Sequence, residues 1–242
     1  MTRIWMSDRV RGLIAVACLG AVFSGFWPAL TPFAGAADAK DNILVKEGER
    51  IFRTVGGVGC ASCHGPYAEG DIGIGPNNRG FGEAKIRAAL QSVKQMAFLQ
   101  EPMTEPNIKA VAAYFNFIGN LQLLKTLVRR SQFIPDRLEV HPGTRIQLVI
   151  KNGNSQPRAF SSDNMGIGDL TIAGRENGDI VWKAPDTEGE FEVRCKDCGQ
   201  GGEKLLVVVS KSAKAFIPSS EPVAAQTDAP KSTSPTRPRN PK

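Results

Sequence analysis

The stretch from Gln132 to Asn152 reads QFIPDRLEVHPGTRIQLVIKN and alternates apolar with polar residues. Alternation of this kind is typical of half-buried strands, so the stretch predicts two strands, with Pro142-Gly143 as the turn between them. The pattern returns in DIVWKAPDTEGEFEVRC, residues 179–195, and the apolar run KLLVVVS, residues 204–210, predicts a closing strand. Short strands separated by Gly and Pro turns predict an all-β sandwich over residues 125–210.

Two cysteines, Cys195 and Cys198, stand in the stretch RCKDCGQGG between the last two of these strands. In an oxidising compartment such a pair most simply closes a disulfide, and this is the role we expect. Two alternatives stay open. The pair could be redox-active, or its thiolates could hold a soft metal such as Cu(I), with Met165 as a distant third ligand.

The order of the β segments resembles that of the cupredoxins, and especially the relatives of cytochrome oxidase subunit II. The matching phrases are Phe133-Ile134-Pro135, Val140 to Gly143, Asn152, Gly189 to Phe191, Cys195, and Val207 to Val209. This resemblance implies a Greek-key sandwich of the blue-copper kind. A blue-copper centre needs two imidazoles and a thiolate. Arg158 stands where the family has its first imidazole, and no His or Met follows Cys198. We therefore expect copper to be unlikely.

Upstream, the stretch GCASCHGP contains Cys60-Ala61-Ser62-Cys63-His64, which matches the Cys-x-x-Cys-His pattern of covalent haem attachment. Cysteines three apart lie on one side of a helical turn, so both thiols can reach the two vinyl groups of one porphyrin edge. The histidine that follows can ligate the iron. The pattern predicts one covalent haem c, bound through Cys60 and Cys63, with His64 as an axial ligand.

The flanking segments resemble the class I cytochromes c over residues 41–120. DNILVKEGERIFRTVGG and EPNIKAVAAYFNFIGN have helical apolar periodicity, with Thr104 before the second segment as a predicted N-cap. The resemblance implies an all-α fold in which the two helices cross closely at Gly48. The chain would then have two domains, an all-α cytochrome fold followed by an all-β cupredoxin-like sandwich.

The same resemblance implies two further roles. Met96 is the expected second axial ligand of the iron, with Met103 as the alternative. The carbonyl of Pro76 is expected to accept a hydrogen bond from the other ring nitrogen of His64. Sequence position, and not the resemblance, gives two other expectations. His141, at a strand-to-turn position, is expected to be solvated, and Arg79, in a loop, to be an ordinary surface arginine.

The two ends of the chain predict export and disorder. Residues 1–36 carry basic residues, an apolar run from Leu13 to Leu30, and Ala34-Gly35-Ala36, which together predict a cleaved signal peptide. An uncleaved membrane anchor is the alternative. Residues 217–242 are rich in Pro and Ser and predict a disordered tail. The protein is expected in the periplasm, either soluble or anchored at its N-terminus.

The net charge of +6 is gathered into no helix or stripe, so nucleic acid is not an expected partner. The combined prediction is a periplasmic electron carrier, not an enzyme, with one haem of His/Met ligation. Its β-domain would dock a dehydrogenase, reductase or oxidase, and it would touch a membrane only through an uncleaved N-terminal segment. The alternatives are a copper- or thiol-handling protein with an accessory haem, and the haem subunit of a larger periplasmic oxidoreductase.

Overall fold

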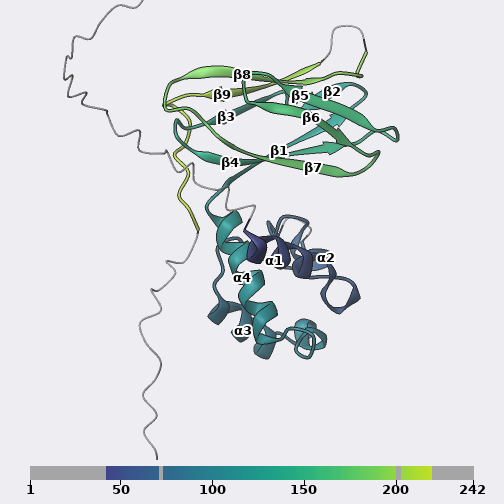
Figure 1. Ribbon diagram of the computed structural model, residues 1–242, viewed down its shortest axis with the longest axis vertical. Helices are drawn as coiled ribbons and strands as arrows, with labels where there is room; N and C mark the ends of the chain where they lie inside the picture. The colour runs from purple at the N-terminus through teal and green to yellow at the C-terminus, as the bar shows by residue number, and fades with distance from the viewer. Residues whose placement is uncertain (1–41, 71–72, 200–202, 220–242) are drawn as a thin grey trace, which may run out of the picture. The chain divides into compact units, whose positions relative to one another are not determined.

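The computed structural model describes residues 42–70, 73–199 and 203–219 (Figure 1). All of them fall in one compact unit, whose first residue is Ala36. The predicted signal peptide, and all but the first three residues of the predicted disordered tail, lie outside the described residues. No helix in the described part of the chain combines the length and apolar character that a membrane crossing needs.

The first half of the described chain is helical. Its α-helices are α1 (Ile43–Thr54), α2 (Ala61–His64), α3 (Glu83–Ser92) and α4 (Glu105–Gly119), and 3-10 turns cover Val55–Gly57 and Lys94–Leu99. The side chain of Asn42 accepts a hydrogen bond from N of Leu44 and so starts α1. Thr104 precedes α4 as predicted, but its side chain makes no capping hydrogen bond. Helices in the expected segments confirm a helical region, whereas a cytochrome c fold stays a prediction.

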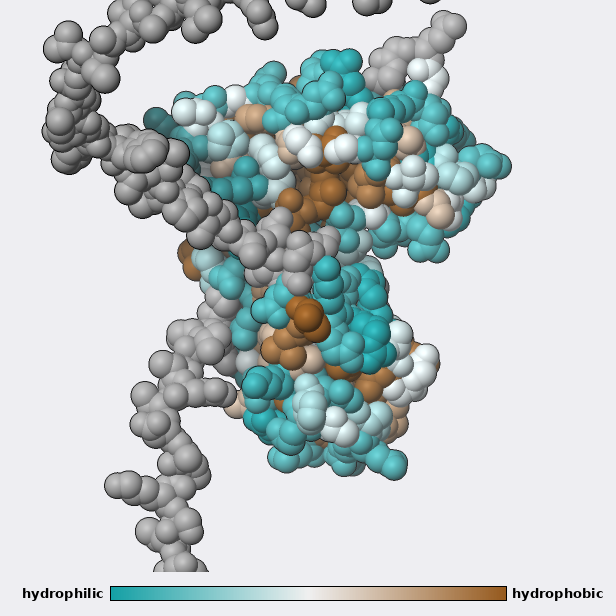
Figure 2. Space-filling view, in the orientation of Figure 1, coloured by the Kyte–Doolittle hydropathy of each residue, from teal (hydrophilic) through white to brown (hydrophobic). Residues whose placement is uncertain are grey.

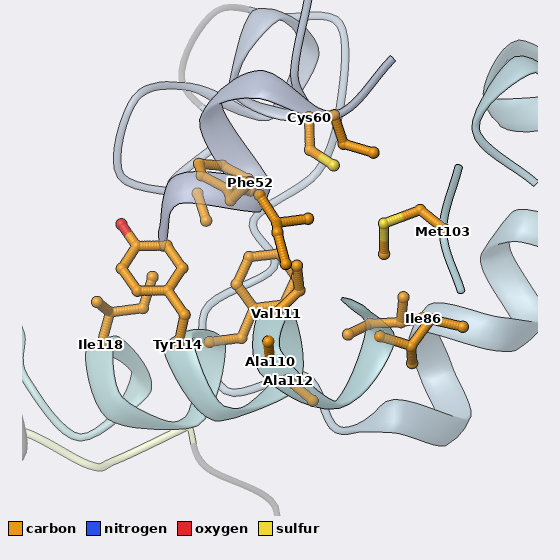
Figure 3. Close-up of a cluster of buried hydrophobic side chains, with 14 of the residues drawn as sticks. Phe52, Cys60, Ile86, Met103, Ala110, Val111, Ala112, Tyr114 and Ile118 are labelled. Atoms are coloured by element: carbon orange, nitrogen blue, oxygen red, sulfur yellow. The ribbon is translucent and has the colours of Figure 1, made fainter. Parts of the chain in front are cut away.

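Helices α1 and α4 pack closely because Gly48 has no side chain. A Cβ atom at Gly48 would overlap the backbone carbonyl of Ala110 on α4. Beside this crossing, the ring of Phe52 lies 5.6 Å from that of Tyr114 and 5.4 Å from that of Phe115. These rings belong to the hydrophobic core of the helical region (Figure 3). The close crossing predicted at Gly48 is therefore present.

The second half forms a sandwich of two sheets (Figure 1). One sheet has the order β2-β1-β4-β7, formed by β2 (Gln132–Ile134), β1 (Gln122–Arg129), β4 (Arg145–Asn152) and β7 (Asn177–Lys183). The other has the order β3-β9-β8-β5-β6, formed by β3 (Arg137–Val140), β9 (Lys204–Val209), β8 (Gly189–Cys195), β5 (Arg158–Ser162) and β6 (Ile167–Ile172). The predicted β-sandwich is confirmed.

The sandwich buries its apolar residues between the sheets. Figure 2 shows hydrophobic residues in the band between the two layers and mostly hydrophilic residues on the outer faces. Strand β4 departs from the predicted alternation, because Gln147 and Val149 are buried along with Ile146, Leu148 and Ile150. Both faces of β4 are therefore covered, which a period-two sequence pattern does not predict.

Arg79 accounts for part of the burial of both faces of β4. The expectation that Arg79 is an ordinary surface arginine is therefore wrong. Its guanidinium is buried and donates hydrogen bonds to the carbonyl oxygens of Tyr67, Ile118 and Leu121 and to Oε1 of Gln147 on β4. Burial lowers the pKa of Arg79 to about 10, so the group stays charged at neutral pH. The four acceptors offset the cost of burying that charge.

Candidate functional site

One cavity in the helical region brings together the residues predicted to bind a cofactor. Its volume is about 390 Å³, and its lining is mainly apolar, with Ile86, Leu90, Val111 and Phe115 among its residues. The predicted ligands and their alternatives also line it, namely Cys60, Cys63, His64, Pro76, Met96 and Met103. The predicted ligands, which are up to 43 positions apart in the chain, from Cys60 to Met103, thus face one space.

The loop after α2 holds His64 in one orientation. Nδ1 of His64 lies 2.9 Å from the carbonyl oxygen of Pro76, and N of Gly75 donates to O of Cys63 at 2.8 Å. A Cβ atom at Gly75 would stand 2.5 Å from Nδ1, so only glycine lets the loop approach the ring this closely. When Nδ1 donates to Pro76, Nε2 carries the lone pair that a metal in the cavity would use.

Cys60 and Cys63 are both reduced thiols in the structure. Cys60 precedes α2 and is buried, whereas Cys63 lies within α2 and is partly exposed. Burial raises the pKa of the Cys60 thiol to about 11, a backbone hydrogen bond lowers it somewhat, and the neighbouring Cys63 raises it. Cys60 therefore stays protonated at neutral pH.

The two methionines enter the cavity from different segments. Met96 lies in the 3-10 turn Lys94–Leu99 and is partly buried, while Met103 lies just before α4 and is 5 % exposed. Figure 3 shows the side chains of Cys60 and Met103 reaching from separate segments toward the same part of the core. Because both thioethers line the cavity, its geometry leaves Met96 and Met103 as ligand candidates.

A second cluster lies at one end of the sandwich, after β8. Cys195 and Cys198 form a disulfide, and both are buried in the core that also contains Met165. The ligand atoms of Cys195, Asp197 and Cys198 lie within 4.8 Å of one another. Asp197 was not singled out from the sequence, although its place between two cysteines was a signal that could have identified it.

Neighbouring backbone and side-chain groups hold the Cys195–Cys198 loop. N of Ala159 donates to Oδ1 of Asp197 at 3.1 Å, and N of Lys196 donates to O of Ala159 at 2.8 Å. Arg158 on β5 donates from Nη1 to the carbonyl oxygen of Asp197. Arg158 thus lies beside the cysteine loop, where the resemblance to cupredoxins would place an imidazole.

The ligand set of a blue-copper centre does not fit this end of the sandwich. The guanidinium of Arg158 is a donor only and cannot ligate a cation. His141 follows Val140, which pairs with Val209 at the far end of β9, whereas Cys195 lies by Glu203 at the near end. A mononuclear copper site of two imidazoles and one thiolate is therefore not formed by the described residues.

No protein-family model matches the chain, and no curated protein matches it. Solved structures resemble it over 36–38 % of its length in the following three cases. The metal-binding domain of the Cu(I)-exporting P-type ATPase CopA from Streptococcus pneumoniae D39, solved with Cu(I), has 15 % identity, 87 % coverage of its own chain and a TM-score of 0.33. Auracyanin A, a blue copper protein from Chloroflexus aurantiacus, has 13 % identity, 98 % coverage of its own chain and a TM-score of 0.31. A purple cupredoxin from Nitrosopumilus maritimus has 17 % identity, 98 % coverage of its own chain and a TM-score of 0.28.

These findings correct the cofactor prediction. One covalent haem c, with copper unlikely, was expected, but the similar structures are cupredoxins and copper-binding proteins. Their likeness belongs to the β region and agrees with a cupredoxin-like sandwich. For the helical region no comparison supports a cytochrome c domain.

Proposed function

We propose that this chain is an exported electron-transfer protein that handles Cu(I) at Cys195 and Cys198. The cluster of Cys195, Asp197 and Cys198 carries the proposal, because its ligand atoms lie within 4.8 Å of one another at the end of a sandwich. Two thiolates are the ligand type that selects Cu(I). Met165 lies in the same core and offers a thioether of the same softness.

The disulfide is the closed form of this site. Reduction adds two electrons and two protons and yields the two thiols, and Cu(I) then displaces both protons when it binds. A thiol reductant of the same compartment supplies the electrons. The hydrogen bonds from Arg158 and Ala159 to Asp197 do not involve sulfur, so they hold the loop in place in both forms.

The cavity of the helical region is the second part of the proposed function. Its thiols, imidazole and thioethers form a soft donor set in an apolar space, which suits a one-electron redox centre. Nε2 of His64 and the sulfur of Met96, or of Met103 in its place, would be ligands of this redox centre. The thiols of Cys60 and Cys63 would bind the centre beside them. The protein would carry electrons without catalysing a reaction of its own, and a periplasmic dehydrogenase, reductase or oxidase would be its redox partner.

Cu(I) titration of the full chain tests the sandwich site. The C60S/C63S variant, reduced with a phosphine, should take up one Cu(I) in competition with bicinchoninate. The matched C60S/C63S/C195S/C198S variant, which also lacks the thiols of the helical cavity, should lose this site, with an affinity lower by at least about 100-fold. The oxidised C60S/C63S protein should bind no Cu(I) at the sandwich. Failure of the reduced C60S/C63S protein to bind Cu(I) would contradict the proposal.

Metal analysis of the protein as isolated tests the helical cavity. Copper in the preparation that is lost in a His64→Ala variant supports a copper centre in the cavity. Iron with a porphyrin spectrum, in place of copper, would show that the cavity holds a haem and reject copper as its metal. Replacing Met96 or Met103 by Ala, one at a time, identifies the thioether ligand by the change in the visible spectrum.

A further inference from the structure

Four arginines gather around one hollow at an end of the sandwich. The hollow has a volume of about 340 Å³ and is lined by Arg129, Arg130, Arg158 and Arg175, together with the residues Gly153, Asn154, Ser155 and Gln156. No Asp or Glu lines it. An accumulation of one charge sign in a concave surface attracts ligands of the opposite sign.

The arginines come from separate elements that the sheet registers bring together. Arg129 ends β1 and Arg130 follows it, Arg158 begins β5, and Arg175 lies between β6 and β7. Val128 pairs with Asn152 at the end of β4, and Arg158 pairs with Ile172 at the end of β6. Four chain segments thus converge at one end, and no short stretch of sequence contains the cluster.

In the part of the chain that the structure describes, these arginines have no carboxylate as an ion-pair partner. Within the described ranges, none of the four forms an ion pair with an Asp or Glu. The recorded side-chain hydrogen bonds go to backbone carbonyls, from Arg158 to Asp197 and from Arg175 to Gly153. Elsewhere on the sandwich, Arg194 and Lys204 both pair with Glu192. The hollow is therefore a basic site whose four arginines form no ion pair with the described carboxylates.

We propose that this arginine hollow docks an acidic segment of a partner protein. Arg129, Arg130 and Arg175 are exposed, so the site is shallow and suits side chains presented on another surface. Guanidinium groups bind carboxylates with two parallel hydrogen bonds, which gives such a contact directional strength. A row of Asp or Glu side chains matches four guanidinium groups better than a single small anion does.

The docking site adjoins the proposed Cu(I) site. Arg158 both lines the hollow and donates to Asp197, between the two cysteines. An acidic partner seated here would therefore lie beside the Cys195–Cys198 loop. Only the neighbouring Cu(I) site rests on the proposed function, since docking requires the charges alone.

Fluorescence anisotropy with a fluorescein-labelled hexaglutamate peptide tests the docking site. The full chain is used without reductant, so that the disulfide stays closed and Cu(I) plays no part. The wild type should bind the peptide at low ionic strength and release it as salt is added. The R129Q/R175Q variant should bind about tenfold more weakly. The control K183Q/K214Q removes the same charge from exposed lysines outside the hollow and should change the affinity by less than about twofold.

The remaining outcomes overturn the proposal. Equal weakening in both variants would show that net charge, and not the hollow, attracts the peptide. Absence of binding to the wild type would also reject it, with circular dichroism showing that each protein is folded. Tighter binding of free citrate than of the peptide would make the hollow a small-anion site. Because the Cu(I) titration is done separately, failure of either proposal leaves the other measurable.

Discussion

The helical region and the sandwich each contain two cysteines with two residues between them, and the two pairs differ in every other respect. Cys60 and Cys63 lie at a short helix, remain thiols, and face an apolar cavity next to His64. Cys195 and Cys198 follow a strand, form a disulfide, and enclose Asp197. The same spacing thus serves two chemistries.

The difference lies in what the backbone does between the cysteines. In α2 the hydrogen bond from N of His64 to O of Cys60 makes a helical turn, and both thiols point to one side. After β8 the chain turns instead, and the Cα atoms of Cys195 and Cys198 come within 5.5 Å, a separation typical of a disulfide. Local backbone form and neighbouring ligands, and not spacing, therefore distinguish a cofactor pocket from a redox pair.

The largest expected effect comes from removing the buried charge that connects the two regions. Arg79→Leu leaves three carbonyl oxygens and Oε1 of Gln147 without their donor. The free energy of unfolding should fall by about 3–5 kcal/mol, because buried acceptors left without a donor cost about 1–3 kcal/mol each; urea denaturation measures the loss. The control Arg129→Leu, at an exposed position, should cost less than about 0.5 kcal/mol. A loss below about 1 kcal/mol for Arg79→Leu would show that the two regions are stable without this contact.

Serine variants of the two cysteine pairs should differ by a smaller amount. C195S/C198S removes a disulfide that closes a very short loop, so the free energy of unfolding should fall by about 2 kcal/mol. C60S/C63S breaks no covalent bond and should cost about 1 kcal/mol or less in protein without cofactor. Thermal denaturation of both variants under oxidising conditions measures the difference. A larger loss for C60S/C63S than for C195S/C198S would show that the disulfide is not the more stabilising of the two cysteine pairs.

The smallest effect concerns the ionisation of Cys60. Because burial raises the pKa of its thiol to about 11, alkylation by iodoacetamide should stay slow up to pH 9 and accelerate near pH 11. The unfolded thiol ionises at lower pH, so unfolding releases a proton and stability should fall as the pH rises from about 9 to 11. Mass spectrometry of the peptide that contains Cys60 measures the rate. Rapid alkylation at pH 8 in the folded protein would refute the burial effect.

Elements with a local signal were predictable. The helix crossing at Gly48 follows from one small residue in an apolar helical stripe. Strands β3, β4, β7 and β8 follow from alternation of apolar and polar residues, and β9 follows from a continuous apolar run. Burial of Gln147 and Val149 was not predictable, because a period-two pattern describes one covered face. Burial of Arg79 was not predictable either, because its four acceptors come from distant parts of the chain.

By itself, the sequence determined the two structural classes, the two cysteine pairs and the residues able to bind a soft metal, because these depend on residue type and short-range spacing. Only the tertiary structure decided which of these residues share a cavity, that Arg79 is buried, and that four separate arginines surround one hollow. Strand register and loop packing bring together residues that are far apart in the chain. Long-range contacts of this kind have no local pattern in the sequence from which they could be predicted.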